Sequence, residues 1–376
     1  MELGKFNDEL GPEKILEVYD VKTGMKGFTV IDNTALGPAK GGIRMTSDVD
    51  IEECFRLARV MTLKNALADL PFGGGKSGII FDKKKDGKKK EEFVKAFSYA
   101  LKPISPSQYV AAPDLNTSEK EMEIFVKENG DFKSATGKPL KLCKKIHGKN
   151  ICGLPHELGS TGFGVCYATQ RALKHLGMKI KNTSVAIEGF GNVGTFTFQC
   201  LENHGFKVVA VSDSEGCLYN PEGLDYDEIS KVKKKKGSVI FGNGKSLVGK
   251  KIFELPVDVL IPAALSDTIT RKNMNKIKAK IIVEAANIPI PLDVEEKLSK
   301  KILIVPDFVA NAGGVISSYA EYLGKGEKYM EDLIREKLCK NTDLVLKRAF
   351  KKNISPREAG MELALARIKK AMKKRN

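Results

Sequence analysis

The sequence predicts an α/β protein of two domains with a cleft between them. Three observations support this fold class. The chain has 376 residues, which is enough to bury two hydrophobic cores. After about residue 160, continuous apolar segments alternate with helical patterns, as in a parallel sheet covered on both faces. One of these segments leads into the glycine pattern GFGNVG and then into a helix, which is typical of a Rossmann-type dinucleotide-binding domain.

Residues 1–158 are expected to form the first domain, of mixed strands and helices. Asp50 and Glu53 form a capping box ahead of a helical apolar pattern, so a helix should begin at residue 51 and carry Lys64 in its last turns. The other expected elements are strands at 25–33, 78–81 and 108–117, a glycine-rich turn at 37–44 and a helix at 91–101.

Residues 159–345 are expected to form the second, Rossmann-type domain. Its apolar strands are expected at 184–191, 207–213, 257–264, 279–287 and 302–307, and its first helices at 161–177 and 193–205. Ser355, Pro356 and Glu358 mark the start of a last helix. We expect the segment 346–376 to return to the first domain.

Two lysines lie among residues that the sequence predicts to be buried. Lys64 ends a helical pattern, and Lys76 follows three glycines twelve positions later. A lysine is seldom fully buried without a partner, and burial lowers its pKa towards neutrality, where an amine can act as an acid or a base. Either the two cations line a cleft, or both side chains extend to water from the edge of the core.

The composition is that of a globular protein, with 42% hydrophobic and 29% charged residues. The net charge of +16 comes largely from lysine runs at 83–90, 233–236 and the C-terminal end. Because no nucleic-acid-binding motif accompanies these runs, we interpret them as solvated surface, with a nucleic-acid surface as the alternative. No segment resembles a membrane span or a signal peptide. The seven cysteines are scattered without a C-x-x-C motif, so we expect reduced thiols and a cytoplasmic location.

Gly189, Gly191 and Gly194 have the G-x-G-x-x-G spacing of a dinucleotide site. These glycines would allow the backbone to approach a pyrophosphate at the helix N-terminus, although they could also serve packing alone. Asp213, nineteen residues after Gly194, could accept hydrogen bonds from the ribose hydroxyls. Asp213 and Glu215 would repel a 2′-phosphate, so NAD is favoured and NADP remains possible.

Six segments together resemble one enzyme family, the glutamate/leucine/phenylalanine/valine dehydrogenases. They are GPAKGGIR, MTLKNALADLPFGGGKSG, AAPDLNT, GFGNVG, VSDSEG and PDFVANAGGV, in this order over roughly residues 20–325. The resemblance implies oxidation of an amino acid to a 2-oxo acid and ammonia, with hydride transfer to a nicotinamide cofactor. It also implies a homo-oligomer, most often a hexamer, assembled through the first domain.

The resemblance assigns a role to each polar residue of the first domain. Lys64 would pair with the substrate α-carboxylate, and Lys76 would polarise the carbonyl and activate water. Asp114 would transfer protons between solvent, water and the departing amine. In the second domain the resemblance implies further cofactor contacts, at Thr161, Asn192, Val193, Asn287 and Asn311.

Lys40 and Ser318 are the residues expected to select the substrate. Family members that act on branched side chains resemble GPALGGxR, with leucine at the position of Lys40. A buried lysine would instead bind a second carboxylate, shared with the Ser318 hydroxyl. The expected reaction is therefore oxidative deamination of L-glutamate to 2-oxoglutarate. The alternatives are the same chemistry on leucine, valine or phenylalanine, or a catalytically silent NAD- or RNA-binding homologue.

The segment 140–160 departs from the family pattern. It lacks the arginine of the R-x-E-A-T-G motif and carries a lysine-rich insertion. Cys143, His147, Cys152 and His156 have the spacing C-x3-H-x4-C-x3-H, which could hold Zn²⁺. A surface loop with incidental Cys and His residues is the favoured interpretation, so no metal is expected.

Overall fold

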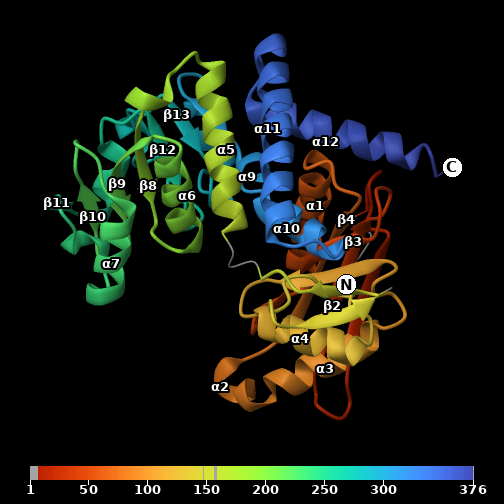
Figure 1. Cartoon of the computed structure of the whole chain (residues 1–376). Coiled ribbons are helices and arrows are strands. Elements are labelled where there is room, and N and C mark those ends of the chain that lie inside the picture. Colours follow the sequence, from red (N-terminus) through yellow and green to blue (C-terminus); the bar gives the residue numbers. More distant parts are fainter. Residues whose placement is uncertain (1–6, 147, 156–158, 376) are drawn as a thin grey trace. The chain divides into compact units, whose positions relative to one another are not determined.

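The computed structural model describes residues 7–146, 148–155 and 159–375. The chain divides into two compact units (Figure 1). The first unit contains Met1–Leu158, Val315–Met330 and Leu363–Asn376, and the second contains Gly159–Gly314 and Glu331–Glu362. The C-terminal part of the first unit therefore begins at Leu363 in the structure, later than the expected residue 346, and the unit also includes a segment of the chain that follows the Rossmann-type strands.

A five-stranded sheet forms the centre of the first unit, with strand order β1-β2-β4-β3-β5. Its strands are β1 (Lys14–Tyr19), β2 (Lys26–Asn33), β3 (Ala39–Thr46), β4 (Gly73–Ile80) and β5 (Tyr109–Pro113). β3 runs parallel to both β4 and β5, whereas β2 is antiparallel to β1 and β4. The parallel arrangement brings the ends of β3 and β5 to the same edge of the sheet.

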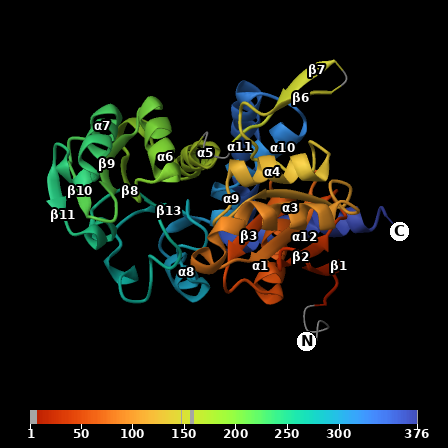
Figure 2. The same cartoon turned by 90° about the horizontal axis from the view of Figure 1, so that it is seen from below.

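Two hydrophobic cores lie on opposite faces of this sheet. Helix α1 (Ile51–Leu67) covers one face, with Ile51, Cys54 and Ala58 packed against Phe28 and Val30 of β2. Helices α3 (Lys90–Leu101) and α4 (Glu119–Asn129) cover the other face (Figure 2), and their aromatic side chains belong to the core there. The N-cap half of the expected capping box is present at the start of α1, since the Asp50 side chain accepts a hydrogen bond from the Glu53 backbone nitrogen; the Glu53 side chain pairs with Arg44.

The glycine-rich segments of the first unit form strands, so the prediction of a turn at 37–44 is wrong from residue 39 onwards. Residues 39–46 form β3 and residues 73–80 form β4. A Cβ added at Gly74 would lie 2.0 Å from the Thr62 Oγ1 and 2.2 Å from the Thr62 backbone nitrogen. The glycines therefore allow helix α1 to approach the sheet closely, a role that turn statistics do not describe.

The second unit is built on a seven-stranded sheet, with strand order β11-β10-β9-β8-β12-β13-β14. Five neighbouring strands run parallel: β9, β8, β12, β13 and β14. Strands β10 and β11 add an antiparallel edge next to β9. The strands are β8 (Ser184–Glu188), β9 (Lys207–Ser212), β10 (Cys217–Tyr219), β11 (Lys245–Leu247), β12 (Val259–Pro262), β13 (Ile281–Val283) and β14 (Leu303–Val305). This arrangement confirms the predicted α/β fold class with a Rossmann-type sheet.

The strand order reverses at β8, which has β9 on one side and β12 on the other. Ligands of open parallel sheets bind at the carboxyl ends of the strands at such a reversal. Helices α5 (Ser160–His175), α6 (Asn192–Asn203), α7 (Tyr226–Lys236), α8 (Leu292–Leu298) and α9 (Asp307–Ala310) surround the sheet. Helix α6 follows β8 directly in the chain, so its N-terminus lies near the carboxyl end of β8, where the strand order reverses.

Three further helices complete the chain: α10 (Gly313–Tyr322), α11 (Glu327–Lys352) and α12 (Pro356–Met372). Within the first unit, Tyr319 and Tyr322 of α10 contact the ring of Phe72 edge-on. Arg367 of α12 donates hydrogen bonds to the carbonyls of Ala66 and Leu67, at the C-terminus of α1. None of the helices in the described ranges combines the length and the hydropathy that a membrane crossing requires.

The lysine-rich insertion forms a hairpin of β6 (Cys143–Ile146) and β7 (Lys149–Cys152), which projects from the first unit (Figure 2). Cys143 and Cys152 face each other in its register and form a disulfide, and Cys166 and Cys200 form a second one. Only Cys54, Cys217 and Cys339 are free, so the expectation of seven reduced thiols is wrong. Sequence spacing gave no indication of either pairing. His147 and His156 lie outside the described residues.

Candidate active site

A cluster of charged side chains lies at the edge of the first unit's sheet where β3, β4 and β5 meet. The Lys76 Nζ in β4 lies 2.9 Å from the Asp114 Oδ2, directly after β5. The Arg44 Nε in β3 lies 2.8 Å from the same oxygen, and Arg44 also contacts Glu53 at 2.5 Å. Burial alone would raise the pKa of Asp114, but the charges of Lys76 and Arg44 outweigh it and hold that pKa below its usual value. Asp114 is therefore a carboxylate between two cations.

Lys40 lies in β3 on the same sheet and is completely buried, with 2% of its surface exposed. Its amine donates a hydrogen bond to the Ala111 carbonyl in β5 at 3.2 Å. Burial lowers the pKa of Lys40 to about 7; the positive charges of Lys138 and Lys76 add to this effect, and Glu321 opposes it. A carboxylate that reached this amine would restore its charge.

A buried ion pair lies next to Lys40. The Lys138 Nζ lies 2.8 Å from the Glu321 Oε1, and neither side chain is more than 2% exposed. Glu321 also accepts hydrogen bonds from the backbone nitrogens of Gly137 and Lys138. On the same stretch of α10, Ser318 is buried and its hydroxyl lies 3.1 Å from the Thr136 hydroxyl.

Lys64 lies in the last turn of α1 and is half-buried. Its neighbour Asn65 donates a hydrogen bond to the Gly73 carbonyl at 2.7 Å, which ties the end of α1 to the start of β4. The contacts described above join Lys76 and Asp114 directly, and they bring Lys40 within electrostatic reach of Lys76.

The glycine pattern of the second unit has the backbone geometry of a phosphate-binding turn. Gly189 has φ of +99°, and a Cβ added at Gly194 would lie 1.8 Å from the Gly189 carbonyl oxygen. No atom lies within 4 Å of a Cβ built at Gly191, so the space in front of this turn is open. Asn192 and Val193 begin helix α6, whose first backbone N–H groups are available to an anion.

Asp213 follows β9 and already has four hydrogen-bond donors. Its carboxylate accepts from the Lys233 Nζ at 2.7 Å, the Ser238 hydroxyl at 3.0 Å and the backbone nitrogens of Val239 and Glu215. Burial raises its pKa, and these donors bring the net pKa below the usual value. The sequence did not indicate that a lysine would neutralise this carboxylate.

Asn287 and Asn311 are brought together, with the Asn311 Nδ2 donating to the Asn287 Oδ1 at 3.0 Å. Thr161 lies in the first turn of α5, close to Gly314.

A network of charged side chains lies next to Asn287. Arg357 contacts Glu284, Glu295 and Asp307, and Asp307 accepts a hydrogen bond from the Ile288 backbone nitrogen next to Asn287.

Comparison with known proteins decides the family. Residues 153–376 match the glutamate/leucine/phenylalanine/valine dehydrogenase family, and residues 12–130 match the dimerisation domain of the same dehydrogenases. The chain belongs to this family. It is 39% identical to a glutamate dehydrogenase of Thermotoga maritima over 93% of this chain and 86% of that protein. It is 35% identical to an NAD-specific glutamate dehydrogenase of Staphylococcus aureus over 94% and 87%.

Solved structures of family members share the fold. A glutamate dehydrogenase from Peptoniphilus asaccharolyticus superposes with a TM-score of 0.84 at 30% identity, covering 97% of this chain and 92% of that chain. A hetero-hexameric glutamate dehydrogenase from Thermus thermophilus, in a leucine-bound form, has a TM-score of 0.81 at 27% identity, with coverages of 97% and 90%. The chain is therefore an amino-acid dehydrogenase, and the family implies a nicotinamide dinucleotide cofactor.

The second unit fits such a cofactor. Besides the open turn at Gly191, two buried polar atoms near the ends of α5 and α9 receive no hydrogen bond from any described residue. They are the Ser160 Oγ and the Asn311 Oδ1. Buried polar atoms normally have a hydrogen-bond partner. These two unpaired oxygens could therefore accept hydrogen bonds from a bound cofactor.

Sequence reasoning missed three charged residues of the first unit: Arg44, Lys138 and Glu321. Arg44 belongs to the GPAKGGIR segment, and its four-residue spacing from Lys40 places it on the same strand. Lys138 and Glu321 are separated by more than 180 positions, and only the fold pairs them.

We predict that the Lys138–Glu321 pair is coupled in stability. Glu321→Gln leaves the buried Lys138 charge unpaired and should lower the free energy of unfolding by about 3–5 kcal/mol. The double variant Lys138→Met/Glu321→Gln should recover most of this loss, because no unpaired charge remains. Urea unfolding followed by circular dichroism measures both.

The exposed pair Glu91–Lys95 provides the control, since Glu91→Gln should leave the unfolding midpoint unchanged. A double variant that is less stable than Glu321→Gln would contradict the coupling.

Proposed function

We propose that this protein catalyses the oxidative deamination of L-glutamate to 2-oxoglutarate and ammonia, and the reverse reductive amination. The observation that carries the proposal is a set of side chains on one sheet of the first unit: Lys76 lies 2.9 Å from the Asp114 carboxylate, and the buried Lys40 amine lies within electrostatic reach of Lys76. The relatives named glutamate dehydrogenase support the choice of substrate. A cytoplasmic location stays a prediction.

Three residues of the first unit have distinct roles in the proposed reaction. Lys64 pairs with the α-carboxylate of glutamate, and the Lys76 ammonium polarises the bond at the α-carbon. Nicotinamide, when bound, accepts the hydride that leaves the α-carbon. Water then adds to the resulting iminium and gives a proton to Asp114, which passes that proton to the amine. Ammonia leaves as the hydroxyl group that came from water releases its proton to Asp114 and the 2-oxo group forms. The 2.9 Å contact between Lys76 and Asp114 supports direct proton exchange between them.

Lys40 and Ser318 bind the side-chain carboxylate of the substrate. Both are buried, so an apolar side chain at this position would leave the Lys40 amine without the anionic partner that a carboxylate provides. The lowered pKa of Lys40 makes this preference dependent on pH, because the free enzyme holds the amine partly neutral near pH 7. These points favour glutamate over leucine, valine or phenylalanine.

NAD is the proposed cofactor, with NADP as a weaker alternative. Asp213 opposes a 2′-phosphate, while Lys233, which contacts Asp213 at 2.7 Å, attracts it. The balance between these two charges sets the selectivity. We also propose that the protein is a homo-oligomer, with a hexamer favoured, because residues 12–130 match a dimerisation domain and a family member is a hexamer.

Lys76→Met should abolish turnover while NAD still binds. Removing a charge that stabilises the reacting centre costs roughly 10²–10³-fold or more in kcat. The proposed cofactor residues lie in the other unit, so the dissociation constant of NADH, measured by fluorescence titration, should stay within about twofold of wild type. Retention of more than a tenth of wild-type activity would exclude Lys76 as the polarising group.

Lys40→Leu should lose glutamate activity and gain activity on norvaline, methionine or leucine, because an apolar side chain then replaces the amine that faces the substrate side chain. Initial rates of NADH formation with each amino acid measure the exchange. The matched control is Lys40→Arg, which keeps the charge and should not gain activity on norvaline.

The same lysine predicts a pH dependence. Lys40 is charged below a pH of about 7 in the free enzyme, so the affinity for glutarate, a dicarboxylate without an amine, should fall as pH rises above that value. In Lys40→Leu the dependence on pH should be much weaker. An equal dependence in both proteins would show that another group binds the second carboxylate.

Lys233→Met should shift selectivity further towards NAD. The variant leaves Asp213 unneutralised, so kcat/KM for NADP should fall at least about tenfold relative to kcat/KM for NAD. Lys235→Met, on the same helix but exposed, is the control and should leave the ratio unchanged. An unchanged ratio in Lys233→Met would remove this lysine from cofactor selection.

A further inference from the structure

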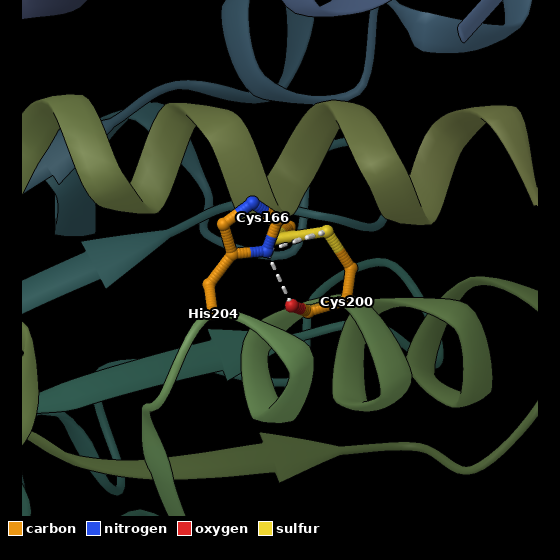
Figure 3. A group of neighbouring side chains, drawn as sticks. All are labelled: Cys166, Cys200 and His204. Atoms are coloured by element: carbon orange, nitrogen blue, oxygen red, sulfur yellow. Dashed lines mark hydrogen bonds between the residues drawn. A yellow bond between two sulfur atoms is a disulfide. The ribbon is translucent and has the colours of Figure 1, made fainter.

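A cluster of three side chains that could bind a metal lies in the second unit, between helices α5 and α6. It contains Cys166 of α5 and Cys200 of α6, both buried, and the exposed His204 that follows α6 (Figure 3). The His204 Nδ1 lies 3.9 Å from the Cys166 sulfur and 3.7 Å from the Cys200 sulfur. None of the three takes part in the proposed catalysis or cofactor binding.

The local sequence explains why these residues meet. Cys200 and His204 are four positions apart, so they lie on the same side of α6 one turn apart. Helices α5 and α6 pack against each other, with the rings of Phe163 and Phe196 in edge-on contact at 5.8 Å. His204 is twelve residues from the start of α6, roughly 18 Å from the glycine turn at 1.5 Å per residue. The cluster is therefore separate from the dinucleotide site.

The two sulfurs form a disulfide in the structure, which is the oxidised state of the pair. A dithiol or phosphine reductant supplies two electrons, and two protons are taken up to give two thiols. Two cysteine sulfurs and one histidine nitrogen are the ligands that Zn²⁺ prefers.

We propose that the reduced Cys166–Cys200 pair and the His204 Nδ1 form a binding site for Zn²⁺ or a similar thiophilic divalent cation. Tetrahedral zinc with bonds of about 2.3 Å to sulfur and 2.05 Å to nitrogen places nitrogen roughly 3.6 Å from each sulfur. The two nitrogen–sulfur distances of 3.7 and 3.9 Å already agree with this geometry. The sulfurs, which are bonded to each other here, have to separate, and the His204 ring has to give up its hydrogen bond to the Cys200 carbonyl.

Metal binding has a defined proton balance. The two thiols release their protons when they coordinate as thiolates. The His204 Nδ1 donates a hydrogen bond to the Cys200 carbonyl at 2.8 Å in the oxidised state. Coordination uses the Nδ1 lone pair, so the ring proton moves to Nε2, where water accepts a hydrogen bond from the exposed ring. The Gln170 Nε2 lies 3.6 Å from the Cys166 sulfur, and its N–H stabilises the thiolate.

The site has three protein ligands and one open position on the side of the exposed histidine. Disulfide and metal exclude each other, because both use the same two sulfurs. The redox state of this pair therefore decides whether the second unit can bind the cation, and the bound metal would join α5 to α6 in place of the disulfide.

Titration with Co²⁺ tests the proposal directly, using the full-length protein. The background carries Cys143→Ser and Cys152→Ser, so that the hairpin pair does not contribute. After reduction by a phosphine without oxygen and removal of the reductant, we expect a thiolate-to-cobalt charge-transfer band that saturates at one equivalent. Zn²⁺ should displace the cobalt and remove the band. The oxidised protein should show no band.

Two variants identify the ligands. Cys200→Ser should abolish the band, and His204→Gln should weaken binding at least tenfold; His204 is exposed, so its substitution leaves the fold intact, as circular dichroism verifies. Cys339→Ser, which removes a free thiol outside the cluster, is the control and should bind as the parent does. Absence of the band at one equivalent in the reduced parent would overturn the proposal. A band that persists unchanged in His204→Gln would overturn the ligand set.

Discussion

The Asp114 carboxylate, held between Lys76 at 2.9 Å and Arg44 at 2.8 Å, is the interaction on which the arrangement of the first unit depends. Three strands contribute to it, because the parallel register of β3 with β4 and β5 brings Arg44, Lys76 and the residue after β5 to the same edge. Without the carboxylate, two cations would face each other in a partly buried site, and without the cations the carboxylate would take up a proton on burial. The two cations hold the pKa of Asp114 below its usual value despite its burial.

Charge balance extends from this cluster into the interior of the unit. Lys40 is buried with a backbone carbonyl as its hydrogen-bond partner, beside the Lys138–Glu321 pair. Glu321 carries the one negative charge among the groups that act on Lys40 here, and Lys138 already uses it. Among the described groups that act on Lys40, no carboxylate remains to pair with its amine, and a substrate with a second carboxylate would supply one. This charge balance is the physical basis for the proposal that the substrate is an acidic amino acid and not an apolar one.

The sequence predicted much of the fold and the chemistry, and the failures have physical causes. Lys76 could be singled out because its charge interrupts a segment that the sequence predicts to be buried, whereas the role of Asp114 came from the family resemblance, and both roles stay predictions. The β3 glycines were misread as a turn because glycine also permits close packing inside a sheet, as at Gly41, where an added Cβ would lie 1.7 Å from the Gly75 carbonyl oxygen. The Lys138–Glu321 pair and the four disulfide-bonded cysteines depend on contacts between distant segments or on hairpin register, which local patterns do not contain. The sequence singled out Asp213, whose contact with a cofactor stays a prediction, and its ion pair with Lys233 required the structure.

The substrate preference of the wild-type enzyme tests the central claim most directly. Initial rates of NADH formation should be measured with L-glutamate, L-norvaline, L-leucine and L-valine at equal concentrations and saturating NAD. A site with buried polar groups built to bind a carboxylate should favour glutamate over leucine by roughly 10³-fold or more in kcat/KM. Faster turnover of leucine or valine than of glutamate would contradict the account, because it would mean that the buried amine of Lys40 does not face the substrate side chain.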